Sequence, residues 1–220
     1  MNTEKEMNLE VAKPNLIKMF FSPEKQFFLM KEKSKIYLPM ITMILIQMIC
    51  SIAITYLIYK EPNVSNQIEI IPGGLKTLLI STIIFTLISV TLTYFITAIL
   101  YKVVMIFMGK DITYNKILHI VVYTSIISSL GLIINIILMY LFGGNKPEYT
   151  NLGLLFTPGT ITHGIAVALD IFTIWKLIIL ILGFKIVANL NKKQTIIISL
   201  LITIISTSYT IIEAIISGLS

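Results

Sequence analysis

Five stretches of this chain are apolar on every face and long enough to cross a lipid bilayer as helices. A bilayer core requires about 20 helical residues, and runs of this length are too long for half-buried strands. The sequence therefore predicts an all-α, polytopic integral membrane protein, built as a bundle of five transmembrane helices. The expected spans cover residues 36–59, 75–101, 117–142, 166–187 and 195–217. The second run can extend to Met108, with Gly109 as a left-handed cap.

The charged residues support this class of protein. Only 13% of the 220 residues are charged, whereas soluble domains contain about 25%. All 17 basic residues are lysine, so the bidentate guanidinium groups that recognise phosphate are absent. The charge is also unevenly placed along the chain, which is typical of integral membrane proteins, so we do not take the net charge of +6 as evidence for a nucleic-acid partner. The single cysteine, Cys50, lies inside an apolar run and is expected to be a buried side chain.

The lysines are divided unevenly between the two sides of the expected spans. The segment before the first span and the loops after the second and fourth spans contain thirteen lysines, and the remaining loops contain three. Loops that are rich in lysine stay in the cytoplasm. The chain is therefore expected to be a multi-pass protein with a cytoplasmic N-terminus and an extracytoplasmic C-terminus.

Residues 1–35 are expected to form a cytoplasmic arm, and residues 36–220 the transmembrane domain. In the arm, Ser22, Pro23 and Glu24 predict the start of a helix. The phenylalanines and lysines around this point suit an amphipathic helix on the cytoplasmic face, in contact with anionic lipid. A docking arm for a protein partner is the alternative. The expected contact residues are Phe20, Phe21, Phe27, Phe28, Lys25, Lys31, Lys33 and Lys35.

Three ionisable residues fall within or at the edge of the last two spans: Asp170, Lys176 and Glu213. Asp170 and Lys176 are six positions apart, so they do not share a helix face. An ion pathway is one interpretation of charge inside a membrane. The favoured interpretation is that Lys176 snorkels to the outer surface or forms a structural pair with Glu213, because Lys176 is the only one of the three that is deep inside a span.

Hydroxyl side chains recur at four-residue steps in two spans, and each set therefore follows one helix face. Small hydroxyl residues allow helices to approach closely and to bond across the interface. Packing is the favoured interpretation, and the lining of a substrate path is the alternative. The two stripes are Ser89, Thr93 and Thr97, and Thr195, Ser199, Thr203 and Thr207.

The sequence contains no motif that indicates catalysis. It has no metal-ligand spacing, no cysteine pair and no glycine-rich phosphate loop. The two histidines, His119 and His163, are expected near opposite faces of the membrane. We therefore expect a protein that is not an enzyme, with no catalytic residue, no metal and no cofactor.

Three segments resemble the bacterial YIP-domain family, the Ypt/Rab-interacting polytopic membrane proteins. They are residues 20–27 (FFSPEKQF), residues 108–110 (MGK) and residues 169–183 (LDIFTIWKLIILILG). The resemblance implies a five-helix bundle with a cytoplasmic N-terminus, in the bacterial cell membrane. It also implies a non-enzymatic partner role, since bacterial members look like accessory proteins of ABC-type exporters or envelope-stress systems. The eukaryotic D-L-Y-G-P motif is absent, which argues against a GTPase partner.

The expected function is therefore that of a membrane scaffold or regulatory protein. Its partners would be anionic lipid at the arm, other membrane proteins such as an ABC-type transporter, or a second copy of the chain. Trp175 is a further expected contact residue. The alternative is a small permease, or an ion- or lipid-handling protein, that uses Asp170, Lys176 and Glu213.

Overall fold

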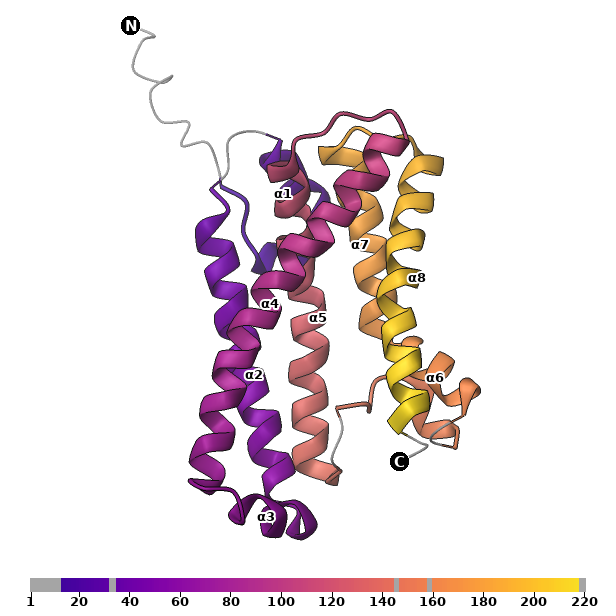
Figure 1. Ribbon diagram of the computed structural model, residues 1–220. Coiled ribbons are helices and arrows are strands. Elements are labelled where there is room, and N and C mark those ends of the chain that lie inside the picture. The colour runs from indigo at the N-terminus through magenta and orange to yellow at the C-terminus, as the bar shows by residue number, and fades with distance from the viewer. Residues whose placement is uncertain (1–12, 32–34, 145–146, 158–159, 218–220) are drawn as a thin grey trace, which may run out of the picture.

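The computed structural model describes residues 13–31, 35–144, 147–157 and 160–217. Across these ranges the secondary structure is helical, apart from one isolated bridge between Asn151 and Asp170. Figure 1 shows the longer helices standing side by side in a bundle. In chain order the elements are η1 (Ile17–Met19), α1 (Pro23–Met30), α2 (Tyr37–Tyr59), α3 (Pro62–Glu69), α4 (Gly74–Phe107), α5 (Tyr114–Phe142), η2 (Leu152–Leu155), α6 (Ile161–Ala168), α7 (Ile171–Val187) and α8 (Lys192–Ser217).

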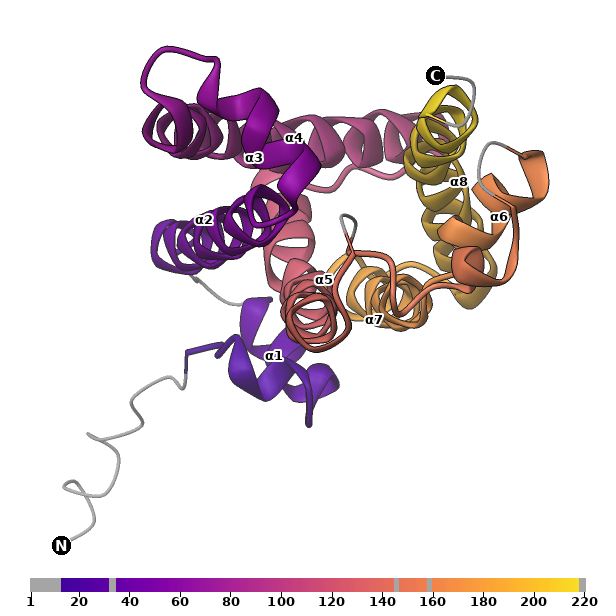
Figure 2. The same cartoon turned by 90° about the horizontal axis from the view of Figure 1, so that it is seen from below.

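Helix α5 is the centre of the bundle. It contacts α2 and α4 on one side and α7 on the other, and α7 in turn packs against α8. Helix α4 has 34 residues; it lies beside α2 near its start and reaches α8 near its end (Figures 1 and 2). Seen from below, α4, α5, α7 and α8 surround a common centre (Figure 2).

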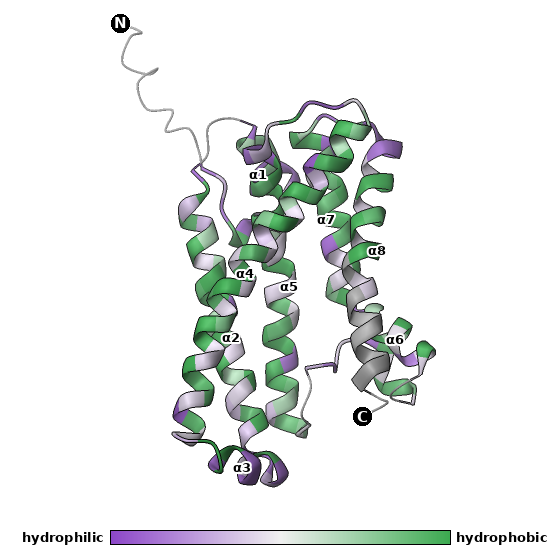
Figure 3. Cartoon of the chain, in the orientation of Figure 1, coloured by the Kyte–Doolittle hydropathy of each residue, from purple (hydrophilic) through white to green (hydrophobic). Residues whose placement is uncertain are grey.

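In the part of the chain that the structure describes, three helices are long and apolar enough to cross a membrane: α2, α4 and α5. Apolar residues cover the sides of the helices, and hydrophilic residues gather at α3 and at the connections of the opposite end (Figure 3). The chain is therefore an all-helical membrane protein. Helix α7 has 17 residues, near the lower limit for a span. The side chains of α8 are described only in part, and five spans stay a prediction.

The end of α4 forms as the sequence predicts. Gly109 has a φ of +68°, its N–H donates to the carbonyl of Ile106, and the next N–H, of Lys110, donates to that of Met105. These two bonds define a Schellman cap. Lys102 then reaches the connection to α5, where its Nζ donates to Asp111 at 2.9 Å and to the carbonyl of Ile112 at 2.6 Å.

The stretch 166–187, expected as one continuous span, is broken at Leu169 and Asp170. The first part ends helix α6, and α7 begins afresh at Ile171. The break occurs because the Asp170 carboxylate accepts the backbone N–H groups of Phe172 and Thr173, both at 2.9 Å. An aspartate in this position is a helix N-cap, so it lies outside the helix that it starts.

The N-terminal arm is part of the bundle. Helix α1 begins at Pro23 as expected and packs against α7. The hydroxyl of Tyr123 in α5 donates to the carbonyl of Pro14 at 3.2 Å, and buried Gln26 accepts the N–H of Asn15 at 2.8 Å. The first bond joins the arm to the central helix, and the second joins two parts of the arm to each other.

Phe27 does not face lipid or a partner, and the expectation for this residue is wrong. Its exposed fraction is 0%. The ring lies against Gly183 of α7 and beside Ile120 of α5, because a glycine leaves room for an aromatic ring at the helix surface. Complete burial of a phenylalanine contributes about 1.5–3 kcal/mol relative to exposure to water, so Phe27 helps to hold α1 against α5 and α7.

Candidate functional site

Helix α7 carries most of the candidate residues, and a polar network fixes its start. The second carboxylate oxygen of Asp170 accepts a hydrogen bond from the Thr150 hydroxyl. The Asn135 amide of α5 donates to that hydroxyl at 2.7 Å, and its oxygen accepts the Thr150 N–H at 3.2 Å. Asp170 therefore joins α7 to α5 and to the preceding loop. It acts structurally here, since both of its carboxylate oxygens are engaged.

The aromatic residues of α7 pack against the arm and against α5. Trp175 lies 5.9 Å from Phe20 and 6.4 Å from Phe172, measured between ring centroids. Phe172 covers Gly131 of α5, where an added Cβ would lie 2.6 Å from the ring. Trp175 is partly buried by these contacts, so its main neighbours are within the chain.

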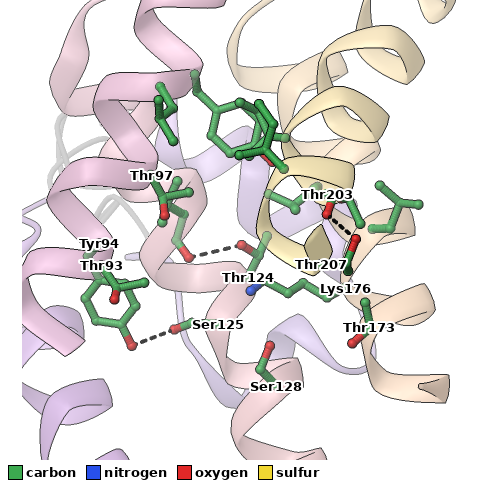
Figure 4. Close-up of a pocket in the computed structure, with 17 residues that line it drawn as sticks. Thr93, Tyr94, Thr97, Thr124, Ser125, Ser128, Thr173, Lys176, Thr203 and Thr207 are labelled. Carbon is green, nitrogen blue, oxygen red and sulfur yellow. Dashed lines mark hydrogen bonds between the residues drawn. The ribbon is translucent and has the colours of Figure 1, made fainter. Parts of the chain in front are cut away.

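A cavity of about 320 Å³ lies between α4, α5, α7 and α8. Figure 4 shows Lys176 extending from α7 into it, toward the hydroxyl groups of α5. Both hydroxyl stripes reach this cavity, each with two of its residues. The polar residues that line it are Thr93, Tyr94, Thr97, Tyr101, Thr124, Ser125, Ser128, Thr173, Lys176, Thr203 and Thr207.

Some of the lining hydroxyls already have partners in the protein. Thr124 donates to the carbonyls of Ile120 and Val121, and Ser125 donates to that of Val122 at 2.7 Å. The Tyr94 and Ser125 hydroxyls are 3.1 Å apart and link α4 to α5. These bonds make α4 and α5 a fixed wall of the cavity.

A second cavity, of about 190 Å³, lies next to the first. Ser128 and Thr173 line both cavities, and Asp170 and Asn135 line only the second. The two cavities therefore form a polar region that extends from the start of α7 to Lys176.

The remaining candidate residues lie apart from this region. In the arm, Phe21 and Phe28 are 84% and 56% exposed, and Lys31 lies over the Phe28 ring at 5.4 Å from its centroid. Lys25 and Lys35 are exposed. Contact of this surface with lipid stays a prediction. Lys33 and the side chain of Glu213 lie outside the described residues.

Several cavity residues were not expected from the sequence. Tyr94, Thr124, Ser125, Ser128 and Thr173 belong to neither of the two hydroxyl stripes described above. Thr173 precedes Lys176 by three positions, and Ser125 precedes Ser128 by three, so each pair shares a helix face. This spacing could have indicated the two additional walls of the cavity.

The described residues contain no group of three or more His, Cys, Asp or Glu side chains that could hold a metal ion. His119 lies in α5 and His163 in α6, and both are buried. The His119 Nδ1 is 2.7 Å from the carbonyl of Asn115, one turn earlier in α5. The cavity combines hydroxyl groups with one amine, a set of groups suited to binding an anion.

The fold and this cavity define a helical integral membrane protein with a polar region inside its bundle. The chain belongs to the Yip1-domain family, whose model matches residues 17–212. It is similar to the membrane protein YknW of Bacillus subtilis (strain 168), with 25% identity over 209 residues that cover 87% of this chain and 86% of the relative. No solved structure matches the chain. The family resemblance and the membrane location are thus confirmed.

Proposed function

We propose that this protein is a non-enzymatic partner protein of the bacterial cytoplasmic membrane, which binds and regulates another integral membrane protein. The proposed partner is an ABC-type exporter, and an envelope-stress system is the second choice. The observation that carries the proposal is the low burial of the α2–α4 hairpin. In the most apolar 18-residue stretch of each helix, only 17% is buried in α2 and in α4, against 39% in α5.

The exposed apolar surface of this hairpin suits contact with other membrane helices. Phe85 of α4 is 73% exposed and Phe107 is 87% exposed. Aromatic side chains are enriched at protein interfaces, where they contribute large contact areas. In the described residues, the cavity offers one amine and no acid–base pair, which supports binding over catalysis.

Site-specific photo-crosslinking in living cells tests the partner. A photoreactive phenylalanine at Phe85 should crosslink to an exporter subunit, identified by mass spectrometry after purification in a mild detergent. The matched control places the same group at Ile127 of α5, which has an exposed fraction of 0% and should give only crosslinks within the chain. Adducts of Phe85 with lipid alone, in cells that express the exporter, would contradict the proposal.

Lys176 favours a second candidate, a small permease or an ion- or lipid-handling protein. Its ammonium group lies in a hydroxyl-lined cavity inside the bundle. Purified protein in liposomes distinguishes the two functions. Flux of an anion that Lys176→Leu abolishes and Lys185→Leu leaves intact would favour transport; Lys185 lies in the last turn of the same helix. No flux across a panel of anions would leave the partner role as the better account.

A further inference from the structure

Among the side chains that the structure describes, none near Lys176 in its cavity is acidic; the side chain of Glu213, its expected partner, lies outside them. The residues that line the cavity include no aspartate or glutamate. Asp170, the nearest acidic residue along the chain, is held by Phe172, Thr173 and Thr150. In the part of the chain that the structure describes, Lys176 forms no hydrogen bond or ion pair with the protein. A cation at this depth is costly without a counter-charge, so the cavity favours an anion.

Four hydroxyl groups around Lys176 are available to such an anion. Among the described residues, those of Thr93, Thr97, Ser128 and Thr173 form no hydrogen bond with the protein, unlike their neighbours Thr124 and Ser125. They come from α4, α5 and α7, three of the four helices that surround the cavity. Hydroxyl groups donate well to carboxylate and phosphate oxygens. One ammonium and several hydroxyls therefore form a donor set for a single anionic group.

The cavity also reaches the lipid-facing surface. Three of its lining residues are exposed on the molecular surface: Thr93 and Leu100 of α4, and Ile205 of α8. Leu100 and Ile205 are apolar and belong to α4 and α8, so the rim of the cavity between these helices carries two apolar side chains beside the hydroxyl of Thr93. A ligand that enters there would place an apolar part at the rim and its charge inside.

We propose that this cavity binds the anionic group of an acyl-chain amphiphile, with Lys176 as the counter-ion and the acyl chain leaving between α4 and α8. The volume of about 320 Å³ lies at the lower end of the range for ligand pockets. It suits a headgroup and the first part of a chain. The site goes beyond the partner role and does not depend on it.

Native mass spectrometry of the purified chain in a nonionic detergent tests the proposal. The probes are oleate, which carries a charge and a chain, oleyl alcohol, which carries only the chain, and acetate, which carries only the charge. One oleate should bind, and neither oleyl alcohol nor acetate at equal concentration should displace it. Oleoyl lysophosphatidic acid distinguishes phosphate from carboxylate, and preferred binding of either anion over oleyl alcohol supports the site.

Substitutions in α7 test whether Lys176 contacts the carboxylate of oleate. Lys176→Met should weaken oleate binding by about tenfold or more, as expected for loss of a hydrogen bond to a charged group. Lys176→Arg should keep most of the affinity because it keeps the charge. Lys185→Met is the matched control and should bind as the parent does, because Lys185 is exposed and does not line the cavity.

Three results would overturn the proposal. Equal binding of oleyl alcohol and oleate would mean that the charge is not recognised, and full binding by Lys176→Met would exclude this lysine. Displacement of oleate by acetate would indicate a site for a soluble anion. If Lys176→Met does not fold, competition on the parent protein still decides between charge and chain. The double variant Thr97→Val/Ser128→Ala, which removes two free hydroxyls, should then also weaken oleate binding.

Discussion

Gly183 of α7 lies so close to the ring of Phe27 that an added Cβ would be 2.8 Å from its Cε1 atom. The same Cβ would lie 2.9 Å from Cγ2 of Ile120 in α5. The three helices α1, α5 and α7 therefore meet at Gly183, where only a glycine fits. Phe27 and Gly183 are the last residues of two of the segments that resemble the YIP-domain family, and the structure brings these segments into contact.

Gly183→Ala should destabilise the protein by about 1–3 kcal/mol, the usual cost of overpacking a core. The new methyl group would displace the Phe27 ring. Phe27→Ala alone should cost about 3–5 kcal/mol, but the double variant should cost less than the sum because the overlap is removed. Thermal unfolding in detergent, followed by circular dichroism, measures these changes. Phe28→Ala is the control. The Phe28 ring is 56% exposed, so its removal should not reduce the destabilisation caused by Gly183→Ala.

Asp170→Ala should destabilise the start of α7 by about 0.5–2 kcal/mol, the range for loss of an N-cap. Asp170→Asn should cost less, because an asparagine oxygen can accept the same N–H groups. Asp111→Ala is a suitable comparison, since Asp111 is fully exposed in its salt bridge with Lys102 and such surface pairs contribute little to stability. Equal losses of thermal stability for Asp170→Ala and Asp111→Ala would contradict the capping role.

The long apolar runs and the helix ends could be predicted from the sequence because they depend on local chemistry. Uniform apolarity predicts a membrane helix without knowledge of its neighbours, and Gly109 ends α4 because glycine adopts a positive φ readily. The break at Asp170 was missed because the flanking residues are apolar on both sides. The strong preference of aspartate for N-caps could have indicated it.

The cavity and the burial of Phe27 depend on tertiary packing and could not be predicted in this way. Phe27 and Phe28 are adjacent and chemically identical, yet one is in the core and the other is at the surface. The difference arises because Phe27 packs against Gly183, which is distant in sequence. Two residues of each hydroxyl stripe line the cavity, and Lys176 lies between them only because α4, α7 and α8 surround one centre.

The two phenylalanines should differ in accessibility. Cys50, the only cysteine, is buried and can be replaced by alanine to give a background without thiols. In this background, Phe28→Cys should react readily with a polar maleimide in open membranes, and Phe27→Cys should react only after denaturation in SDS. Labelling is measured by a mass shift on a gel. Rapid labelling of Phe27→Cys in native membranes would mean that α1 does not stay packed on α7.

The lysine distribution predicts that α8 ends outside the cytoplasm, and reporter fusions test this orientation. Alkaline phosphatase fused after Ser220 should be active, because it folds only outside the cytoplasm, and a fluorescent protein at the same point should be dark. Fusions after Lys110, between α4 and α5, should give the reverse, since Lys110 and the nearby Lys102 of α4 and Lys116 of α5 are three of the thirteen lysines of the cytoplasmic side. A fluorescent fusion after Ser220 would mean an even number of spans. It would then exclude α7 and α8 as two separate crossings in addition to α2, α4 and α5.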